Sequence, residues 1–267
     1  ISIVIPVYKD KKTFENVFEA VCKQTIRPKQ IVIIDSSDDD DIGINLHKYN
    51  DNIEIEYKKV ERSFPGRARN LGAQIASEKY LAFLDSKTVP KKNWLSGSFA
   101  MLKDYDVILG SVIYKGASSF KKLISVAIYG ENSVESISGA LMLKSVFLKI
   151  GFFHEKARAG EDIDWRIRAK ESEFNYYLPA KENTVYSEIS SNLIFHIKRS
   201  FVYQMHGARL DIQHSTKVVF LSLFLILLAS LAPIWNDIVG HDNYVFFVPH
   251  ILKIFLLFLG IFVFFSF

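Results

Sequence analysis

The chain has 267 residues, of which 49% are hydrophobic and 23% are charged, and its formal net charge is +4 at pH 7. These averages hide an uneven distribution, because residues 217–267 hold only four charged side chains and 10 of the 22 Phe. Such a segment argues against a wholly soluble protein. The single cysteine, Cys22, excludes a disulfide framework and is typical of a reducing compartment.

The first 86 residues alternate short apolar runs with amphipathic stretches, which is typical of βαβ units and a mostly parallel sheet. Ligands of such sheets bind beyond the carboxyl ends of the strands, so we expect the chemistry there. Two of these positions begin with an aspartate, Asp35 and Asp85. The expected strands are 1–8, 30–36, 53–60 and 80–85, and the expected helices are 13–24, 41–49 and 66–77.

The middle of the chain is less regular. A helix is expected at 160–172, because the acidic pair Glu161 and Asp162 suits a helix N-terminus. The expected strands of this part are 106–115, 138–143, 175–179 and 184–186.

Two apolar stretches close the chain, at 218–235 and 244–267. At about 1.5 Å rise per residue, each is long enough to cross a hydrocarbon core of roughly 30 Å as a transmembrane helix. Lys253 interrupts the second stretch, so a re-entrant or interfacial hairpin remains an alternative there.

The segment 191–216 mixes apolar residues with Lys198 and Arg199, which predicts an amphipathic helix lying on a membrane surface. Basic residues precede the first apolar stretch, whereas the connector 236–243 has no Lys or Arg. The basic side, and with it the large domain, is therefore expected to face the cytoplasm. The expected organisation is a catalytic domain at 1–190, a juxtamembrane segment at 191–216 and a transmembrane region at 217–267.

Six short motifs along the chain carry polar or glycine residues at the ends of the expected strands and helices. They are Ile3 to Tyr8, Gln24 to Ser37, Gly66 to Gly72, Phe83 to Ser86, Gly139 to Met142 and Gly160 to Trp165. In this order and spacing they resemble a family 2 glycosyltransferase, and the resemblance covers about residues 1–210. That resemblance implies an α/β domain with the Rossmann-like GT-A fold, a nucleotide-sugar donor and an inverting mechanism.

The resemblance assigns Asp35 to the base of the donor, because a carboxylate accepts a hydrogen bond from a uracil or guanine ring N–H. An aspartate that caps a turn is the alternative. Arg69 and Asn70, at a helix start, would reach the diphosphate, or would serve as a surface arginine and a helix cap. The complete expected donor set is Pro6, Tyr8, Asp35, Arg69, Asn70, Asp85 and Lys87.

Asp162, beside Glu161, matches the general base that takes the proton of the acceptor hydroxyl in inverting members. The alternative is an ordinary helical ion pair between Asp162 and Arg166. For the acceptor we expect Gly139 and Trp165. The Trp165 ring would either stack on a sugar or pack in the core.

Relatives usually carry Asp-x-Asp after the fourth strand and a histidine after a late strand, and these residues hold a divalent metal. Here the corresponding residues are Asp85, Lys87 and Ser187. Asp85 alone would bind Mg²⁺ or Mn²⁺ weakly. We therefore expect Lys87 to stand in for the metal, with Asp85 as metal ligand only if an ion is used.

The resulting expectation is an integral membrane enzyme that moves one sugar from a nucleotide-diphosphate sugar to a hydroxyl of a lipid-linked or membrane-presented glycan. Its partners are the donor, that acceptor and membrane lipid, without nucleic acid. A polyprenyl-phosphate sugar synthase and a non-catalytic membrane scaffold are the alternatives. A processive synthase is discounted, because no Gln-x-x-Arg-Trp motif follows the proposed base.

Overall fold

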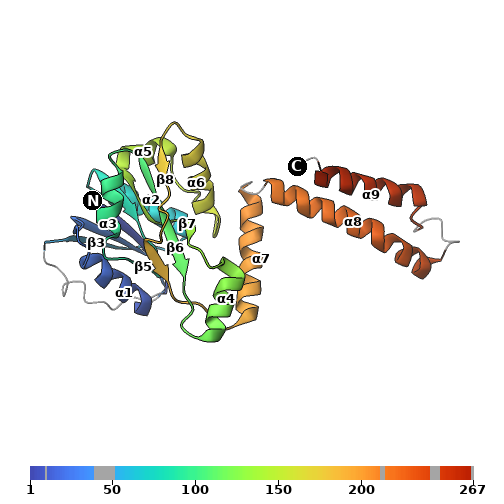
Figure 1. Cartoon of the computed structure of the whole chain (residues 1–267), viewed down its shortest axis with the longest axis horizontal. Coiled ribbons are helices and arrows are strands. Elements are labelled where there is room, and N and C mark those ends of the chain that lie inside the picture. The colour runs from blue at the N-terminus through green and yellow to red at the C-terminus, as the bar shows by residue number, and fades with distance from the viewer. Residues whose placement is uncertain (10, 39–51, 211–213, 241–246, 266–267) are drawn as a thin grey trace. The chain divides into compact units, whose positions relative to one another are not determined.

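The structure is a computed structural model that describes residues 1–9, 11–38, 52–210, 214–240 and 247–265. The chain divides into two compact units, Ile1–Leu210 and Asp211–Phe267. The first unit is an α/β domain built around one twisted sheet (Figure 1). Its boundary follows the helix α7 (Leu193–Arg209), which therefore belongs to the first unit.

The sheet has a parallel half and a mixed half, and this arrangement confirms the predicted α/β class. In the parallel half the order is β3 (Glu54–Lys59), β2 (Gln30–Asp35), β1 (Ser2–Val7) and β4 (Tyr80–Phe83). The mixed half continues with β7 (Val134–Leu143), β6 (Val107–Tyr114), β9 (Thr184–Tyr186) and β5 (Thr88–Pro90), and β8 (Tyr176–Tyr177) pairs with β6.

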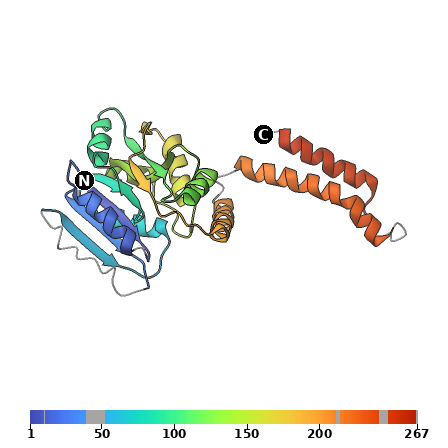
Figure 2. The ribbon, with the colours of Figure 1, turned by 60° about the horizontal axis from the view of Figure 1, so that its bottom comes forward.

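Both faces of the central strands are buried, which explains why their sequences are apolar without a polar alternate position. Ile3 and Ile5 of β1 face one hydrophobic core, and Val4 faces the other. On the first side lie α1 (Lys11–Cys22) and α3 (Trp94–Met101). On the second side lie α2 (Pro65–Ile75), α5 (Lys144–Ile150) and α6 (Glu161–Glu171), and Figure 2 shows this layering.

One further pair of helices flanks the mixed half of the sheet. The helix α4 (Ser119–Tyr129) lies beside α7 in both ribbon views (Figures 1 and 2).

The second unit consists of α8 (His214–Val239) and α9 (His250–Phe265). Within the described residues one helix segment, Leu221–Val239, is long and apolar enough to cross a membrane. The apolar part of α9, His250–Ile261, is shorter. The second predicted span, 244–267, therefore stays a prediction.

Most predicted elements of the first unit are present within a few residues of their expected bounds. The predicted helix 41–49 lies outside the described residues. Sequence analysis missed β5, α3, α4 and α5, and it placed the start of β7 at Ser138 although the strand begins at Val134. The early part of β7 carries Glu135 and Ser136, whose polarity concealed the strand.

Candidate active site

The carboxyl ends of β1, β2 and β4 lie next to one another and bring Tyr8, Asp35 and Asp85 to one edge of the sheet. Pro6 lies in β1 opposite Ile34 of β2 and is half-buried. The Tyr8 ring is 36% exposed, with the Lys9 ammonium 5.5 Å and the Arg62 guanidinium carbon 5.6 Å from its centre. An exposed ring flanked by two cations suits an aromatic, anionic ligand.

Asp35 is fully buried at the end of β2, and both of its carboxylate oxygens are hydrogen-bonded. Oδ1 accepts from the Ser37 backbone N–H at 2.9 Å, and Oδ2 accepts from the Tyr57 hydroxyl at 2.8 Å. Lys59 approaches Oδ2 to 3.3 Å. Burial raises the pKa of Asp35, but the bonds from Ser37 and Tyr57 and the charge of Lys59 outweigh it and hold that pKa below its ordinary value.

Arg69 joins Asp85, which follows β4, to Glu161 at the start of α6. Its side chain is 5% exposed, Nη2 donates to Asp85 Oδ1 at 2.7 Å, and Nη1 donates to Glu161 Oε1 at 2.8 Å. Burial lowers the pKa of the guanidinium, but the charges of Asp85 and Glu161 outweigh this effect and raise that pKa above its ordinary value. Arg69 therefore stays charged. This guanidinium is held between two carboxylates, and its contact with the diphosphate stays a prediction.

Two glycines allow α2 and the start of α6 to come together at Arg69. A Cβ on Gly66 would lie 2.4 Å from the His154 carbonyl oxygen, so only glycine lets the first turn of α2 lie against this loop. Gly160 caps α6 with φ +88°, in the left-handed region that favours glycine. The Gly-Glu-Asp motif is therefore explained in part by backbone geometry.

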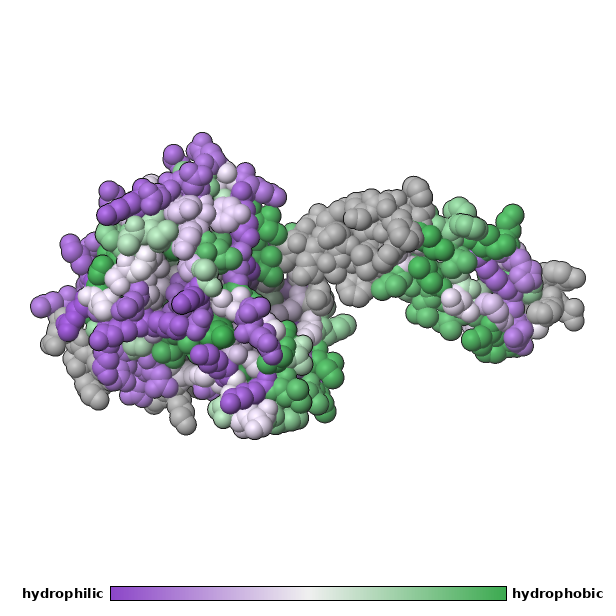
Figure 3. Space-filling view, in the orientation of Figure 1, coloured by the Kyte–Doolittle hydropathy of each residue, from purple (hydrophilic) through white to green (hydrophobic). Residues whose placement is uncertain are grey.

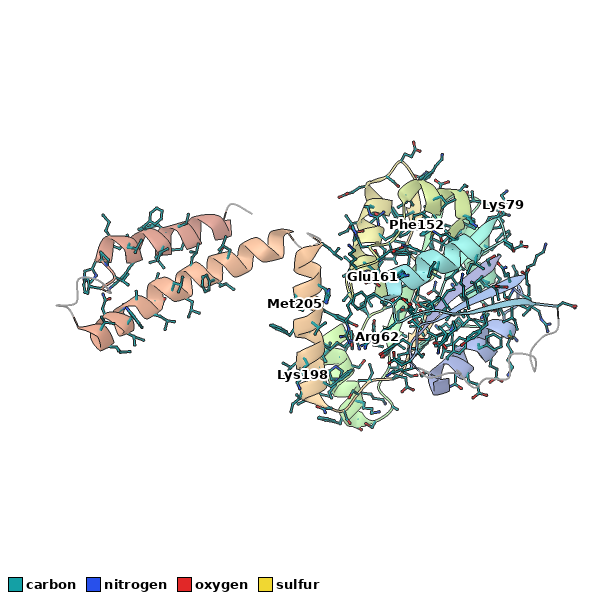
Figure 4. All side chains as sticks on the ribbon, turned by 180° about the vertical axis from the view of Figure 1, so that it is seen from behind. Arg62, Lys79, Phe152, Glu161, Lys198 and Met205 are labelled. Carbon is teal, nitrogen blue, oxygen red and sulfur yellow. The ribbon has the colours of Figure 1, made fainter. Side chains whose placement is uncertain are left out.

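Glu161 and Asp162, although adjacent, have different surroundings. Glu161 is buried against Arg69, and its Oε2 has no hydrogen-bond partner among the described residues. Burial raises the pKa of Glu161 to about 7, against the opposing effect of Arg69, and the Asp162 charge adds to the rise. The Asp162 side chain is 30% exposed. Figure 4 shows Glu161 beside the beginning of α2.

The predicted alternative role of Asp162, an ion pair with Arg166, is weak in this geometry. Arg166 Nη2 approaches Asp162 Oδ2 only to 3.7 Å, whereas Nη1 donates to Glu135 Oε1 at 2.8 Å. Lys170 also binds Glu135. Sequence reasoning missed Glu135, because nothing in the sequence indicated that β7 extends far enough to reach α6.

Three expected site residues are committed to structural contacts. The Asn70 amide donates to the Phe153 carbonyl at 2.9 Å and accepts from the Phe153 N–H at 3.0 Å, so Asn70 holds this loop, and its predicted contact with the donor stays a prediction. Gly139 is buried in β7, and its carbonyl accepts from Trp94 Nε1 at 2.7 Å. Trp165 is fully buried.

The expected stacking of Trp165 on an acceptor sugar does not agree with the burial of this ring. Its ring packs on Phe147 and Phe153, with centroids 5.8 and 5.6 Å away, and its Nε1 donates to the Gly151 carbonyl. A side chain with no exposed surface offers no face to a sugar. The core interpretation therefore holds for Trp165.

The residues in the expected metal position do not fit a divalent cation. Oδ1 of Asp85 accepts from Arg69, Lys87 places an ammonium two residues later, and Ser187 is an exposed hydroxyl. Across the part of the chain that the structure describes, no group of three His, Cys, Asp or Glu side chains is placed to hold a metal ion. A hard cation needs several oxygen ligands, which this set does not supply.

Comparison with known proteins bears on the fold and on the family of the chain. A crystal structure of S. aureus TarS 1-349 in complex with UDP-GlcNAc superposes with a TM-score of 0.59 at 17% identity, covering all of this chain and 72% of that one. This likeness confirms the GT-A-like fold.

Among curated proteins, glycosyltransferase AglE of Haloferax volcanii is 26% identical over 66% of this chain and 62% of its own length. An Escherichia coli protein named UDP-Glc:alpha-D-GlcNAc-diphosphoundecaprenol beta-1,3-glucosyltransferase WfaP is 35% identical over 32% of this chain and 34% of its own. The chain spans less than two thirds of the first relatives that it matches. The glycosyl transferase family 2 model matches residues 2–161, and the chain belongs to this family.

Proposed function

We propose that the chain transfers one sugar from a nucleotide-diphosphate sugar to an acceptor hydroxyl, with inversion and with Asp162 as general base. The observation that carries this proposal is the contrast between Glu161 and Asp162. Glu161 is buried on Arg69, which also holds Asp85 at the donor edge, while Asp162 remains partly exposed in the first turn of α6.

In the proposed reaction the acceptor oxygen forms a bond to the anomeric carbon while the bond from that carbon to the diphosphate breaks. The hydroxyl proton passes to the Asp162 carboxylate, and the nucleoside diphosphate leaves with the bonding electron pair. A general base in this position contributes on the order of 10²–10⁴ in rate.

The leaving diphosphate gains negative charge, which the ammonium of Lys87 would stabilise as a point charge. The poor fit of Asp85, Lys87 and Ser187 to a metal supports this role. We therefore propose a transfer that needs no divalent ion.

For the donor we propose a UDP-sugar that binds across Pro6, Tyr8 and Asp35. The TarS relative was crystallised with UDP-GlcNAc and with UDP, and its fold is shared by this chain. The exposed Tyr8 ring between two cations supports binding of a base and its phosphates at this edge. Because Asp35 is fully buried and hydrogen-bonded at both oxygens, it would act on the base through Tyr57 and Ser37, which it orients.

For the acceptor we propose a lipid-linked or membrane-presented glycan, reached from the cytoplasmic face of a membrane that α8 crosses. The apolar segment Leu221–Val239 supports the anchor, and the name of the WfaP relative describes a diphosphoundecaprenol-linked acceptor. The second span, formed around α9, is part of the same proposal.

Two alternatives make different predictions. A polyprenyl-phosphate sugar synthase has a phosphate nucleophile that is already ionised, so it would not need Asp162. A non-catalytic scaffold would neither transfer nor hydrolyse a donor. The partial exposure of Asp162 favours the base role over both.

The test compares purified full chain with Asp162→Asn and Asp164→Asn in a screen of UDP-, GDP- and dTDP-sugars, with donor hydrolysis and transfer as readouts. Asp164 is the matched control, because it lies in the same turn but pairs with Arg168 at 2.8 Å. Asp162→Asn should lower kcat by about 10²–10⁴, and Asp164→Asn by much less. Equal turnover of wild type and Asp162→Asn would reject the base assignment.

A further inference from the structure

The six most exposed large apolar side chains of the first unit lie on α4 and α7. The exposed fraction reaches 66% for Leu123 of α4, and 69% and 71% for Ile197 and Phe201 of α7. Apolar residues cover the lower part of the domain where these two helices lie (Figure 3), and Figure 4 labels Lys198 and Met205 along α7. A contiguous exposed apolar surface of this kind marks an interaction site.

In α7 the usual arrangement of a surface helix is reversed. His196 is buried, with Nε2 2.9 Å from the Ser190 carbonyl, and Arg199 is half-buried with its Nε donating to the Tyr203 hydroxyl. Ile197 and Phe201 face outward. The helix of a soluble domain normally turns its apolar side inward, so α7 is built to meet an apolar environment.

The helix α4 is also held with its polar contacts inward and its apolar side chains outward. Ser125 is buried and donates to the Tyr114 carbonyl at 2.7 Å, and the Tyr129 ring stacks on Tyr114 with centroids 3.8 Å apart. These inward contacts leave Phe120 and Leu123 on the outer side, at 50% and 66% exposure. The outer faces cannot turn inward without breaking these contacts.

The charged side chains of α4 and α7 are all basic. Neither α4 nor α7 contains an Asp or Glu, whereas together they contain five basic residues. These residues are Lys121, Lys122, Lys198, Arg199 and Arg209. Basic residues around an apolar face complement an anionic lipid surface.

We propose that the outer faces of α4 and α7 form one docking surface that inserts into the headgroup region of an anionic lipid bilayer. The proposal rests on the membrane attachment in the proposed function and adds α4, a second point of contact. A second copy of the chain is a poorer occupant, because an isologous pair would bring two sets of these cations together without an acidic partner on either helix.

Depth-dependent fluorescence quenching on the full chain tests this surface. Single cysteines are introduced as Leu123→Cys, Phe201→Cys, Leu228→Cys in α8 and Glu56→Cys on the exposed edge strand β3, and each is labelled with a polarity-sensitive probe. The native Cys22 serves as background, because burial raises its thiol pKa to about 11 and suppresses labelling. The vesicles are phosphatidylcholine with or without phosphatidylglycerol, and contain doxyl-labelled lipid.

Probes at 123 and 201 should be quenched about twofold or more by shallow doxyl groups in the anionic vesicles, and the probe at 56 should not. Quenching of the probe at 228, without quenching at 123 and 201, would reject the docking surface and support the α8 anchor. Quenching at 123 and 201 without 228 would support the docking surface and reject the anchor. Energy transfer between labelled copies at 123, without quenching by lipid, would overturn the proposal in favour of a dimer.

Discussion

Arg69 and Glu161 form a buried ion pair across 92 positions of the chain, with Nη1 and Oε1 2.8 Å apart and both side chains 5% exposed. Through its other nitrogen Arg69 holds Asp85. The donor edge of the sheet and the helix that carries the proposed base are therefore joined by one guanidinium.

Above pH 7, where the Glu161 carboxylate is ionised, Arg69→Met should destabilise the fold by about 3–5 kcal/mol, because it leaves that carboxylate buried without its counter-charge. Urea denaturation measures this change. Arg67→Met is the control, since Arg67 is exposed on the same helix and its loss should cost less than about 0.5 kcal/mol. If the double variant Arg69→Met/Glu161→Gln were as unstable as Arg69→Met, the ion pair would not be the cause.

The raised pKa of Glu161 predicts a stability that falls with increasing pH. The folded state holds the Glu161 proton up to about pH 7, whereas the unfolded chain releases it near 4.5. Between these values the folded state binds more protons, so its stability declines by about 3 kcal/mol as pH rises and then levels off.

Urea titrations of wild type and Glu161→Gln across this pH range measure the effect. The unfolding free energy of wild type relative to Glu161→Gln should decline by about 3 kcal/mol as the pH rises from about 4.5 to about 7. Glu171→Gln, at an exposed position of the same helix, should follow wild type. A constant difference between wild type and Glu161→Gln would show that the carboxyl titrates normally.

Glu135→Gln should weaken the proposed base. Once Arg166 is released from Glu135, it would turn to Asp162, now 3.7 Å away, and compete with the acceptor hydroxyl for that carboxylate. We expect kcat to be lower by about three- to tenfold.

The control for this variant is Lys170→Gln, which removes the other partner of Glu135 and leaves Arg166 in place. Its kcat should match wild type. An unchanged kcat in Glu135→Gln would mean that Glu135 does not keep Arg166 from Asp162.

The Lys87 proposal predicts that EDTA leaves transfer unchanged and that Lys87→Met lowers kcat by about 10²-fold. Lys87→Asp restores the Asp-x-Asp pattern of the family and should gain activity on addition of Mn²⁺. Lys91→Met, which removes an exposed ammonium paired with Glu182, is the control. Loss of wild-type activity in EDTA, recovered with Mn²⁺, would refute the proposal.

The parallel half of the fold was predictable, because β1, β2 and β4 are short apolar runs separated by amphipathic helices. The helix α4 was not, since its exposed apolar side chains do not follow the inward pattern that sequence reasoning assumes. The strand β7 was placed too late for a similar reason, because Glu135 is polar and pairs with a helix.

At the site, the sequence indicated which residues meet but not how their side chains are used. Arg69 and Asn70 were correctly placed at a helix start, yet their partners, Glu161 and Phe153, are about 90 and 80 residues away. No local pattern reveals such long-range pairing. The two interpretations of Trp165 could be separated only by its burial.

The paired bonds between Asn70 and Phe153 have a consequence for the loop that precedes the proposed base. They fix one end of the segment that leads to α6, and the Gly160 cap fixes the other. An exposed residue between these two points, such as Lys156, is therefore expected to tolerate substitution without moving the carboxylate of Asp162. The loop beside the proposed base is thereby held at both of its ends.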